Sequence, residues 1–479
     1  MTKPLPTRGQ PPLTARLEPW MTELLADPQQ CAALMEQYAS PVNVVFPAVL
    51  PRNAAELVDA GVSRGVDVRV FFARKANKAL GFVEAARDAG HGIDVASERE
   101  LRQVLGMGVE PQRIILSAAI KPDALLRFAI AQGVTISTDS LSELDRIAAH
   151  TVALNAEGQN VRAQVAPRIA PDPQRLPPTR FGEVAQEWIR GSVGKEKEHV
   201  DVVGVHAHLH GYAESDRRAV LADCLEVIDE LREQGQRPTF IDLGGGVPMS
   251  YLDSADEWEE FTKQRQLAVE GKPTQLRTWK DNPLATTYPF HQTPTRGAWL
   301  EELLDGDIPG YGNAADALNS RELALHLEPG RSLLDGGGVI LARVAFVKKR
   351  SDGVDLVGLE MNRTQCKTTS DDILLDPLVV PTARAAEGAD DAEDVRKSNR
   401  GRACYLVGAY CIEDEVIIWR RLTFPEGVAP GDCVAIPNTA GYFMHILESA
   451  SHQIPLANNV VCKQESALEF FQDAIDGAN

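Results

Sequence analysis

The chain has 479 residues, too many for one ordinary domain, and this length fits a large domain joined to a smaller one. Hydrophobic residues make up 44% of it, which is enough for an extensive core and argues against global disorder. With 49 basic and 68 acidic residues the formal net charge is −19, which disfavours nucleic acid or an anionic membrane as the main partner.

The cysteines and the N-terminal segment indicate the compartment. The seven cysteines form no Cys-X-X-Cys pair and no metal-finger spacing, so we expect free thiols and no metal centre. The segment MTKPLPTRGQPPL lacks the apolar core of a signal peptide. No apolar run reaches the roughly 20 residues of a membrane span. We therefore expect a cytoplasmic protein with no membrane partner.

A proline-rich lead and a helical pattern at residues 20–38 come first in the chain. From about residue 41 to 330, short β-branched runs alternate with amphipathic stretches, which indicates βα units around a parallel sheet. About eight strands favour a closed (β/α)₈ barrel, with an open doubly wound sheet as the alternative. These strands are expected at residues 42–46, 68–73, 92–95, 113–117, 135–138, 162–169, 202–208 and 239–243.

Two later segments have a different texture. Residues 252–300 are polar and rich in Trp, Gln, Thr and Pro, which indicates an insertion that covers an active site, contacts a second subunit or is a plain surface excursion. After residue 330 strand patterns follow one another without helices, which predicts an all-β domain over 331–479. Its small, charged stretch at 381–400 is expected to be a mobile loop. The predicted strands are residues 339–348, 354–360, 403–407, 415–422 and 432–436.

Several polar motifs follow strands, and each is weak when taken alone. The strand predicted at residues 68–73 runs into Lys75. Parallel folds place their chemistry at this end of a strand, although a surface lysine has the same pattern. Three glycines after TFIDL leave backbone amides open to a phosphate, or form a tight turn. His206, His208 and His210 alternate onto one face, yet no acid or cysteine with ligand-like spacing accompanies them, so we do not assign a metal.

Taken in order, the motifs resemble the fold-type III pyridoxal 5'-phosphate (PLP) enzymes, which include alanine racemase and the ornithine, arginine and diaminopimelate decarboxylases. The similarity is greatest to the decarboxylase branch. It implies an α/β plus β architecture: an alanine racemase-like, PLP-binding (β/α)₈ barrel over 41–330, and a C-terminal β-domain with which the arm at 1–40 is partly associated. The segments that carry it are ARKANK (73–78), GIDVASERE (92–100), RII (113–115), APRI (166–169), TRFG (179–182), VHAHLHG (205–211), DLGGG (242–246), EPGRS (328–332), GAYC (408–411) and PNTAGY (437–442).

The resemblance implies a role for each matched residue. Lys75 is the lysine that forms an imine with the cofactor aldehyde, Glu328 pairs with the pyridine nitrogen, and His208 stacks on the ring. A carboxylate at 328 favours decarboxylation, because the racemases use arginine there. The polar shell around the lysine and the cofactor comprises Asp94, Glu100 and Arg168. The phosphate site comprises Gly244, Gly245, Gly246, Arg331 and Tyr442.

Cys411 resembles a cysteine that crosses a dimer interface and protonates the α-carbon after CO₂ has left. A thiol can act as a general acid, although a buried inert thiol is the common role of a single cysteine. The implied assembly is a homodimer with shared active sites.

The chain departs from the family where substrate is recognised. Ile412 stands where the basic amino-acid decarboxylases have an acid, and Glu413 is one of three following acids that could substitute for it. Asn362 lies in a segment that replaces the family's Asp-Gly, and His210-Gly211 lacks the usual phosphate-contacting hydroxyl. We expect an amino acid or amino-acid conjugate as substrate, bound by Ile412, Asn362 and Glu413, and not plain lysine, ornithine or diaminopimelate.

Two other functions remain open from the sequence. One is a different PLP reaction on the same fold, namely racemisation, aldol cleavage or elimination. The other is a catalytically idle PLP-binding regulatory protein, against which the intact Lys75, Arg331 and Tyr442 argue.

Overall fold

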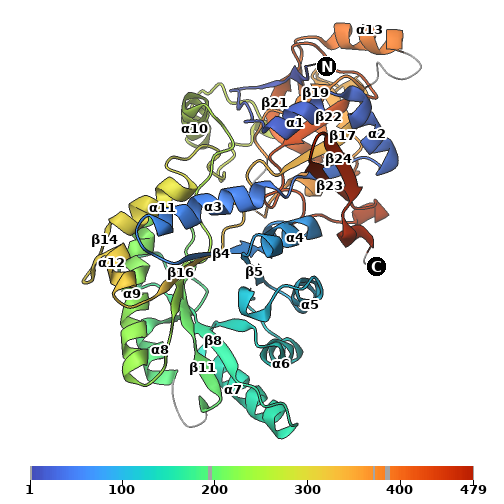
Figure 1. The fold of residues 1–479 in the computed structure, drawn as a ribbon. Helices are drawn as coiled ribbons and strands as arrows, with labels where there is room; N and C mark the ends of the chain where they lie inside the picture. The colour runs from blue at the N-terminus through green and yellow to red at the C-terminus, as the bar shows by residue number, and fades with distance from the viewer. Residues whose placement is uncertain (1–2, 193–196, 370–372, 383–388, 478–479) are drawn as a thin grey trace.

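The computed structural model describes residues 3–192, 197–369, 373–382 and 389–477, which form a barrel lobe and a β-sheet lobe side by side (Figure 1). The barrel lobe contains a parallel sheet in the order β11-β8-β7-β6-β5-β4-β16-β13-β12. Its strands are β4 (Val68–Ala73), β5 (Gly92–Val95), β6 (Ile114–Leu116), β7 (Thr135–Thr138), β8 (Ala163–Pro167), β11 (Val200–Val202), β12 (Gly204–His206), β13 (Phe240–Asp242) and β16 (Ala324–Leu327).

The nine strands close into a ring of eight positions. Only Val203 separates β11, which pairs with β8, from β12, which pairs with β13. These two strands act as one interrupted strand, and a parallel bridge between Arg168 and His206 closes the ring. The predicted barrel is therefore confirmed, and the alternative of an open sheet is wrong.

Helices cover the outside of the barrel between successive strands. Serine side chains cap three of them, because Ser97 Oγ accepts from Glu100 N, Ser140 Oγ from Glu143 N and Ser254 Oγ from Glu257 N, each at 3.2 Å. The helices of this lobe are α3 (Val49–Val62), α4 (Leu80–Asp88), α5 (Glu98–Gly106), α6 (Asp123–Gln132), α7 (Leu141–Ala156), α8 (Ala185–Gly191), α9 (Glu214–Glu233), α10 (Ala255–Val269), α11 (Arg296–Asp305) and α12 (Ala314–Asn319).

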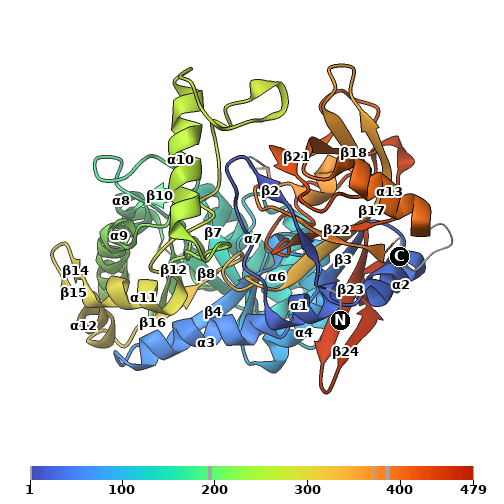
Figure 2. The ribbon, with the colours of Figure 1, turned by 90° about the horizontal axis from the view of Figure 1, so that it is seen from above.

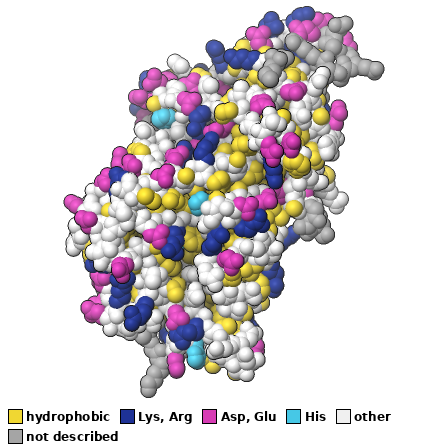
Figure 3. All heavy atoms as spheres, in the orientation of Figure 1, with side chains coloured by type: hydrophobic (Ala, Val, Ile, Leu, Met, Phe, Trp, Pro, Cys, Tyr) yellow, Lys and Arg dark blue, Asp and Glu magenta, His cyan; other side chains and the backbone are white. Residues whose placement is uncertain are grey.

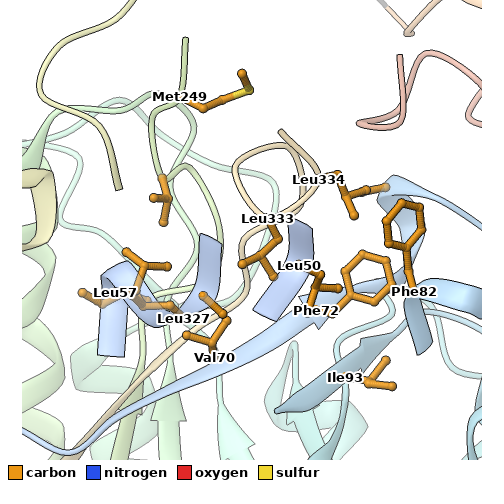
Figure 4. Close-up of a cluster of buried hydrophobic side chains, with 14 of the residues drawn as sticks. Leu50, Leu57, Val70, Phe72, Phe82, Ile93, Met249, Leu327, Leu333 and Leu334 are labelled. Carbon is orange, nitrogen blue, oxygen red and sulfur yellow. The ribbon is translucent and has the colours of Figure 1, made fainter. Parts of the chain in front are cut away.

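A dry core joins the barrel to its helices. Val70 and Phe72 of β4 point into it beside Leu327 of β16, and Leu50 of α3 and Phe82 of α4 cover them (Figure 4). All of these side chains are at most 2% exposed. The strand that leads to Lys75 is thus held rigidly by packing.

The second lobe is an 11-stranded, mostly antiparallel sheet. The five strands predicted after residue 330 are confirmed, as β17 (Gly338–Lys349), β18 (Asp355–Leu359), β20 (Ala403–Val407), β21 (Val416–Thr423) and β22 (Cys433–Pro437). After residue 330, three further strands of this sheet were not predicted: β19 (Leu378–Val380), β23 (Asn458–Gln464) and β24 (Leu468–Gln472).

The N-terminal segment belongs to this second sheet. β1 (Leu5–Pro6) pairs with β19 and β2 (Arg8–Gly9) with β21, while α1 (Pro19–Leu25) and α2 (Pro28–Gln37) pack against the sheet through a separate apolar cluster. We expected the barrel to begin near residue 41. Instead β3 (Val42–Val45) pairs with β17 and β23, so β4 is the first strand of the barrel.

On the face seen in Figure 3, hydrophobic side chains gather across the middle, with acidic and basic side chains spread around them. Among helices of the described residues, none combines the length and apolarity that a membrane span needs.

The charged stretch at 381–400 is not a loop throughout, because residues 389–399 form α13 (Ala389–Asn399); residues 383–388 lie outside the described residues. The helix is anchored by Arg396, which is 1% exposed and donates from Nε to Asp432 Oδ2 at 2.9 Å. Asn399 adds a hydrogen bond to the carbonyl of Val428 at 2.8 Å. The small, charged composition of this stretch did not reveal the anchor, because the partner of Arg396 lies more than thirty residues further along the chain.

Removing Asp432 should destabilise the β-domain. In Asp432→Ala the buried Arg396 guanidinium loses its hydrogen-bonded counter-charge and keeps only Glu393, at 3.6 Å, a change that costs about 3–5 kcal/mol of unfolding free energy. Urea unfolding measures this loss. The matched control is Asp352→Ala, which breaks the exposed Arg350 pair and should leave the midpoint unchanged. Equal midpoints for the two variants would contradict the anchoring role.

Candidate active site

A cavity of about 320 Å³ opens at the carboxyl ends of the barrel strands, where the β-domain meets them. From the barrel come Lys75, His208, Glu328 and Arg331, and from the β-domain comes Tyr442, among other residues. The sequence placed these five residues far apart, and the fold brings them around one space. In parallel barrels this end is where active sites lie.

Lys75 lies in a 3₁₀ turn, η1 (Arg74–Ala76), directly after β4. Its Nζ donates to Asp94 Oδ2 at 3.1 Å, and Asp94, on β5, is 1% exposed and also accepts from Ser117 Oγ. Burial lowers the pKa of Lys75, but Asp94, Tyr442 and Glu328 raise it by more, so the net shift is upward. Asp94 therefore holds the amine at a fixed point on the cavity floor.

Glu328 follows β16 and is 2% exposed, yet its Oε1 has no hydrogen-bond partner among the described residues. Its Oε2 lies 3.5 Å from His206 Nε2, and His206 Nδ1 is 2.5 Å from Ser137 Oγ. Burial raises the pKa of Glu328, and Lys75 and Arg168 oppose that rise. A buried carboxylate with a free oxygen at a cavity wall is suited to bind an N–H group of a ligand.

Only two of the three histidines of the motif approach Glu328. His206 ends β12, so strand alternation does not continue, and His210 is exposed at the cavity rim. His206 and His208 do meet Glu328, with ligand atoms within 4.8 Å of one another. Burial and nearby cations lower the pKa of both imidazoles well below the usual value, so both are neutral. A cluster of this kind is common without a metal, and we assign none.

The glycine segment fits closely around His208. The amide of Gly245 donates to His208 Nδ1 at 3.1 Å, which puts the ring proton on Nε2. Gly244 and Gly246 have φ of 62° and 77°, and a Cβ on Gly244 would lie 2.3 Å from His208 Nδ1. Gly244 is therefore required for the close approach to His208, and Gly246 for the approach to Arg217, whose Nη2 would lie 2.0 Å from a Cβ there.

Arg331 is a half-buried cation that forms no ion pair with an acid of the described residues. Its guanidinium lies 3.9 Å from the ring centre of Tyr288 and 5.0 Å from that of Tyr442, and Nη1 donates weakly to the carbonyl of Gly441 at 3.4 Å. Tyr442 has φ 73° and donates its amide to the carbonyl of Ala76 at 2.8 Å. Arg331 beside Gly245 thus forms a site for an anion.

Sequence reasoning missed Arg217 of α9. It is 1% exposed, and its Nη2 donates to the carbonyls of Gly211 at 2.8 Å and Gly245 at 3.2 Å, while its Nε and Nη1 have no partner among the described residues. Burial lowers its pKa to about 10. Arg217 is the fourth residue of α9, in a charged stretch, and no sequence signal marked it as a brace behind the glycine segment.

The other predicted site residues lie around the cavity rather than in it. Glu100 Oε2 accepts from Ala96 N at 2.7 Å, which shapes the start of α5. Arg168 stacks on Phe181 at 4.0 Å and lies 3.7 Å from Asp139. Asn362 is fully buried and caps the short helix η5 (Arg363–Cys366).

Cys411, Ile412 and Glu413 lie together on an exposed turn between β20 and β21, and none of them lines the cavity of their own chain. Ile412 is 53% exposed. The structure of one chain thus separates the predicted proton donor from Lys75.

The chain is similar to known proteins over most of its length. Residues 54–275 match the family model described as "Pyridoxal-dependent decarboxylase, pyridoxal binding domain". An uncharacterised protein, y4yA, of Sinorhizobium fredii is 31% identical over 425 residues, which cover 88% of this chain and 87% of that protein.

Two relatives carry a named activity. A diaminopimelate decarboxylase of Pseudomonas aeruginosa is 25% identical over 344 residues, 68% of each chain. The crystal structure of diaminopimelate decarboxylase from M. jannaschii in complex with L-lysine superposes with a TM-score of 0.67 at 19% identity, over 96% of this chain and 95% of that one. At that identity the superposition shows a shared fold.

The fit between Gly244 and His208 gives a prediction about stability. Gly244→Ala introduces both backbone strain, at about 1 kcal/mol, and a clash with the imidazole that adds about 1–3 kcal/mol. Gly235→Ala is the matched control, because Gly235 has φ 89° but a Cβ there would meet nothing within 4 Å. Chemical unfolding should show the larger loss for Gly244→Ala. Equal losses would mean that His208 moves aside freely.

Proposed function

The chain belongs to the fold-type III PLP-dependent decarboxylases, and from this premise we propose that it binds PLP in the cavity and releases CO₂ from the α-carbon of an amino acid or amino-acid conjugate. The observation that carries the proposal is the pairing of two incomplete sites on one cavity. Among the described residues, Glu328 offers a buried oxygen without a hydrogen-bond partner and Arg331 a half-buried cation without an acid, and both line the cavity together with Lys75.

These residues fit the cofactor by charge and shape. Lys75 would attach it, Glu328 Oε1 would accept the pyridine N–H, and the face of His208 would cover the ring. Arg331, Tyr442 and the amide of Gly246 would hold the phosphate, whereas the amides of Gly244 and Gly245 already donate to Asp242 and His208. When bound, PLP supplies an electron sink for the charge that develops at the α-carbon as CO₂ leaves.

The protein side chains then set protonation and position. Asp94 keeps Lys75 oriented from below through the 3.1 Å contact. Glu328 Oε2 lies 3.5 Å from His206 Nε2, and Ser137 orients His206 through a 2.5 Å contact with Nδ1. A carboxylate at this position favours a protonated pyridine nitrogen, which supports decarboxylation over racemisation.

The proton that replaces CO₂ needs a donor, which we assign to Cys411. Its thiol is exposed on its own chain and lies outside the cavity there, which supports delivery to the cavity of a second copy. The proposed enzyme is therefore a homodimer with shared active sites. The seven cysteines are all free thiols, which supports the proposed cytoplasmic location.

The turn after Cys411 bears on the substrate. Asp414 accepts from Trp279 Nε1 at 3.0 Å and pairs with Lys280 at 2.6 Å, and Glu415, 3% exposed, accepts from Arg363 N at 2.8 Å. Of the three acids after Ile412, only Glu413 forms neither a hydrogen bond nor an ion pair within the described residues. A distal ammonium group would thus find an exposed isoleucine and one exposed acid, which supports a substrate without that group.

The proposal is tested by CO₂ release from a broad panel of amino acids and conjugates with added PLP. We expect turnover of at least one compound, poor turnover of L-lysine, L-ornithine and diaminopimelate, and no turnover by Lys75→Ala. Lys78→Ala, three residues on and paired with Glu448, is the matched control and should remain active. Product formation without CO₂ would favour racemisation, aldol cleavage or elimination. Efficient turnover of the three basic substrates would overturn the substrate assignment.

Complementation tests the shared site. Lys75→Ala and Cys411→Ala should each be inactive or severely slowed. When the two are unfolded and refolded as an equal mixture, half of the dimers are mixed and each holds one intact site, so about a quarter of wild-type activity should return. Recovery in the mixture of Lys75→Ala with Glu328→Gln should be absent, because both residues serve the same chain's cavity. No recovery in the first mixture would contradict donation between chains.

A further inference from the structure

The insertion at residues 252–300 reaches the anion end of the cavity. Its Tyr288 is 5% exposed and lines the cavity next to Gly245, Gly246 and Arg331. The phenol ring lies flat against the Arg331 guanidinium at 3.9 Å. An excursion from the barrel thus supplies one wall of the site that we assign to the phosphate.

A second tyrosine joins Tyr288 there. Tyr212 lines the same cavity, and its ring meets that of Tyr288 edge to face at 5.6 Å. Burial raises the pKa of the Tyr288 phenol well above its usual value. The Tyr288 hydroxyl therefore stays protonated and can donate to an anion.

The chain lacks another hydroxyl at this place. Gly211, one residue before Tyr212, has φ 97° and no side chain, and its carbonyl accepts from Arg217. The Arg217 guanidinium thus binds the backbone at Gly211, and the phenols of Tyr212 and Tyr288 line the cavity nearby.

The insertion is held so that Tyr288 has little freedom. Near the cavity, Tyr251 N donates to the carbonyl of Phe290 at 2.8 Å, and the rings of Tyr251 and Phe290 lie within 6.2 Å of that of Tyr288. At its far end, Tyr405 of β20 donates to the carbonyl of Thr278 at 2.8 Å. Figure 2 shows α10, the helix of the insertion, rising beside the β-domain strands.

We propose that the insertion completes the cofactor site, with the hydroxyl groups of Tyr288 and Tyr212 donating hydrogen bonds to the phosphate of PLP in place of the hydroxyl absent at Gly211. This inference rests on the proposed function. It assigns a function to the insertion, because the Tyr288 ring contacts Arg331 and its hydroxyl adds a hydrogen-bond donor beside that guanidinium.

The test measures cofactor affinity rather than turnover. Apoenzyme is titrated with PLP, and with pyridoxal, which lacks the phosphate, by the visible absorbance of the bound form. Tyr288→Phe and Tyr212→Phe each keep the ring and remove one donor, so PLP affinity should fall about ten- to a hundredfold, as expected for a hydrogen bond to a charged group. Pyridoxal affinity should not change. Tyr405→Phe is the matched control: it removes a buried phenol that anchors the same insertion, and should not alter either affinity.

Three outcomes would overturn the inference. Unchanged PLP affinity in both cavity variants would show that the phenols are only packing. Equal losses for PLP and pyridoxal, or an equal loss in Tyr405→Phe, would mean that the insertion acts through general stability. Absence of PLP binding by the wild-type protein would overturn the proposed function itself, and is thus distinct from failure of this assignment.

Discussion

The active site depends on charges at the barrel mouth that the described residues do not fully compensate. Lys75 and Asp94 neutralise each other at 3.1 Å, whereas Glu328 keeps an oxygen without a partner and Arg331 keeps a guanidinium without an acid. Burying such groups without partners is costly, so the packed strands beneath them must supply the stability that holds them. The apolar layer of Val70, Phe72 and Leu327 does this directly below the site.

The β-domain is a structural part of that site. The amide of Tyr442 donates to Ala76 and the side chain of Asn77 donates to the carbonyl of Ala440, so the turn that carries Lys75 is fixed from above by the second lobe. Arg331 lies between aromatic rings from both lobes, Tyr288 and Tyr442. The cavity therefore exists only when the two lobes are docked.

The insertion links the cavity to the turn that carries Cys411. Its Tyr288 lies against Arg331, while Trp279 and Lys280 bind Asp414, three residues after the cysteine. If Cys411 serves a neighbouring chain, one segment positions residues for two active sites. Some of the polar groups of this insertion therefore form contacts between the lobes.

Most of the architecture could be predicted from the sequence because strand and helix periodicity is local, and Lys75, the glycines, Glu328 and Arg331 all follow strands whose ends must meet in a closed barrel. Pairing partners are not local. The strand at 42–45 pairs in the second sheet and not in the barrel, and α13 is held by the buried Arg396. His210 is exposed because β12 ends at His206. Only the tertiary structure brought Arg217 and Tyr288 to the glycine segment, because burial and distance across the fold decide which side chains share a cavity.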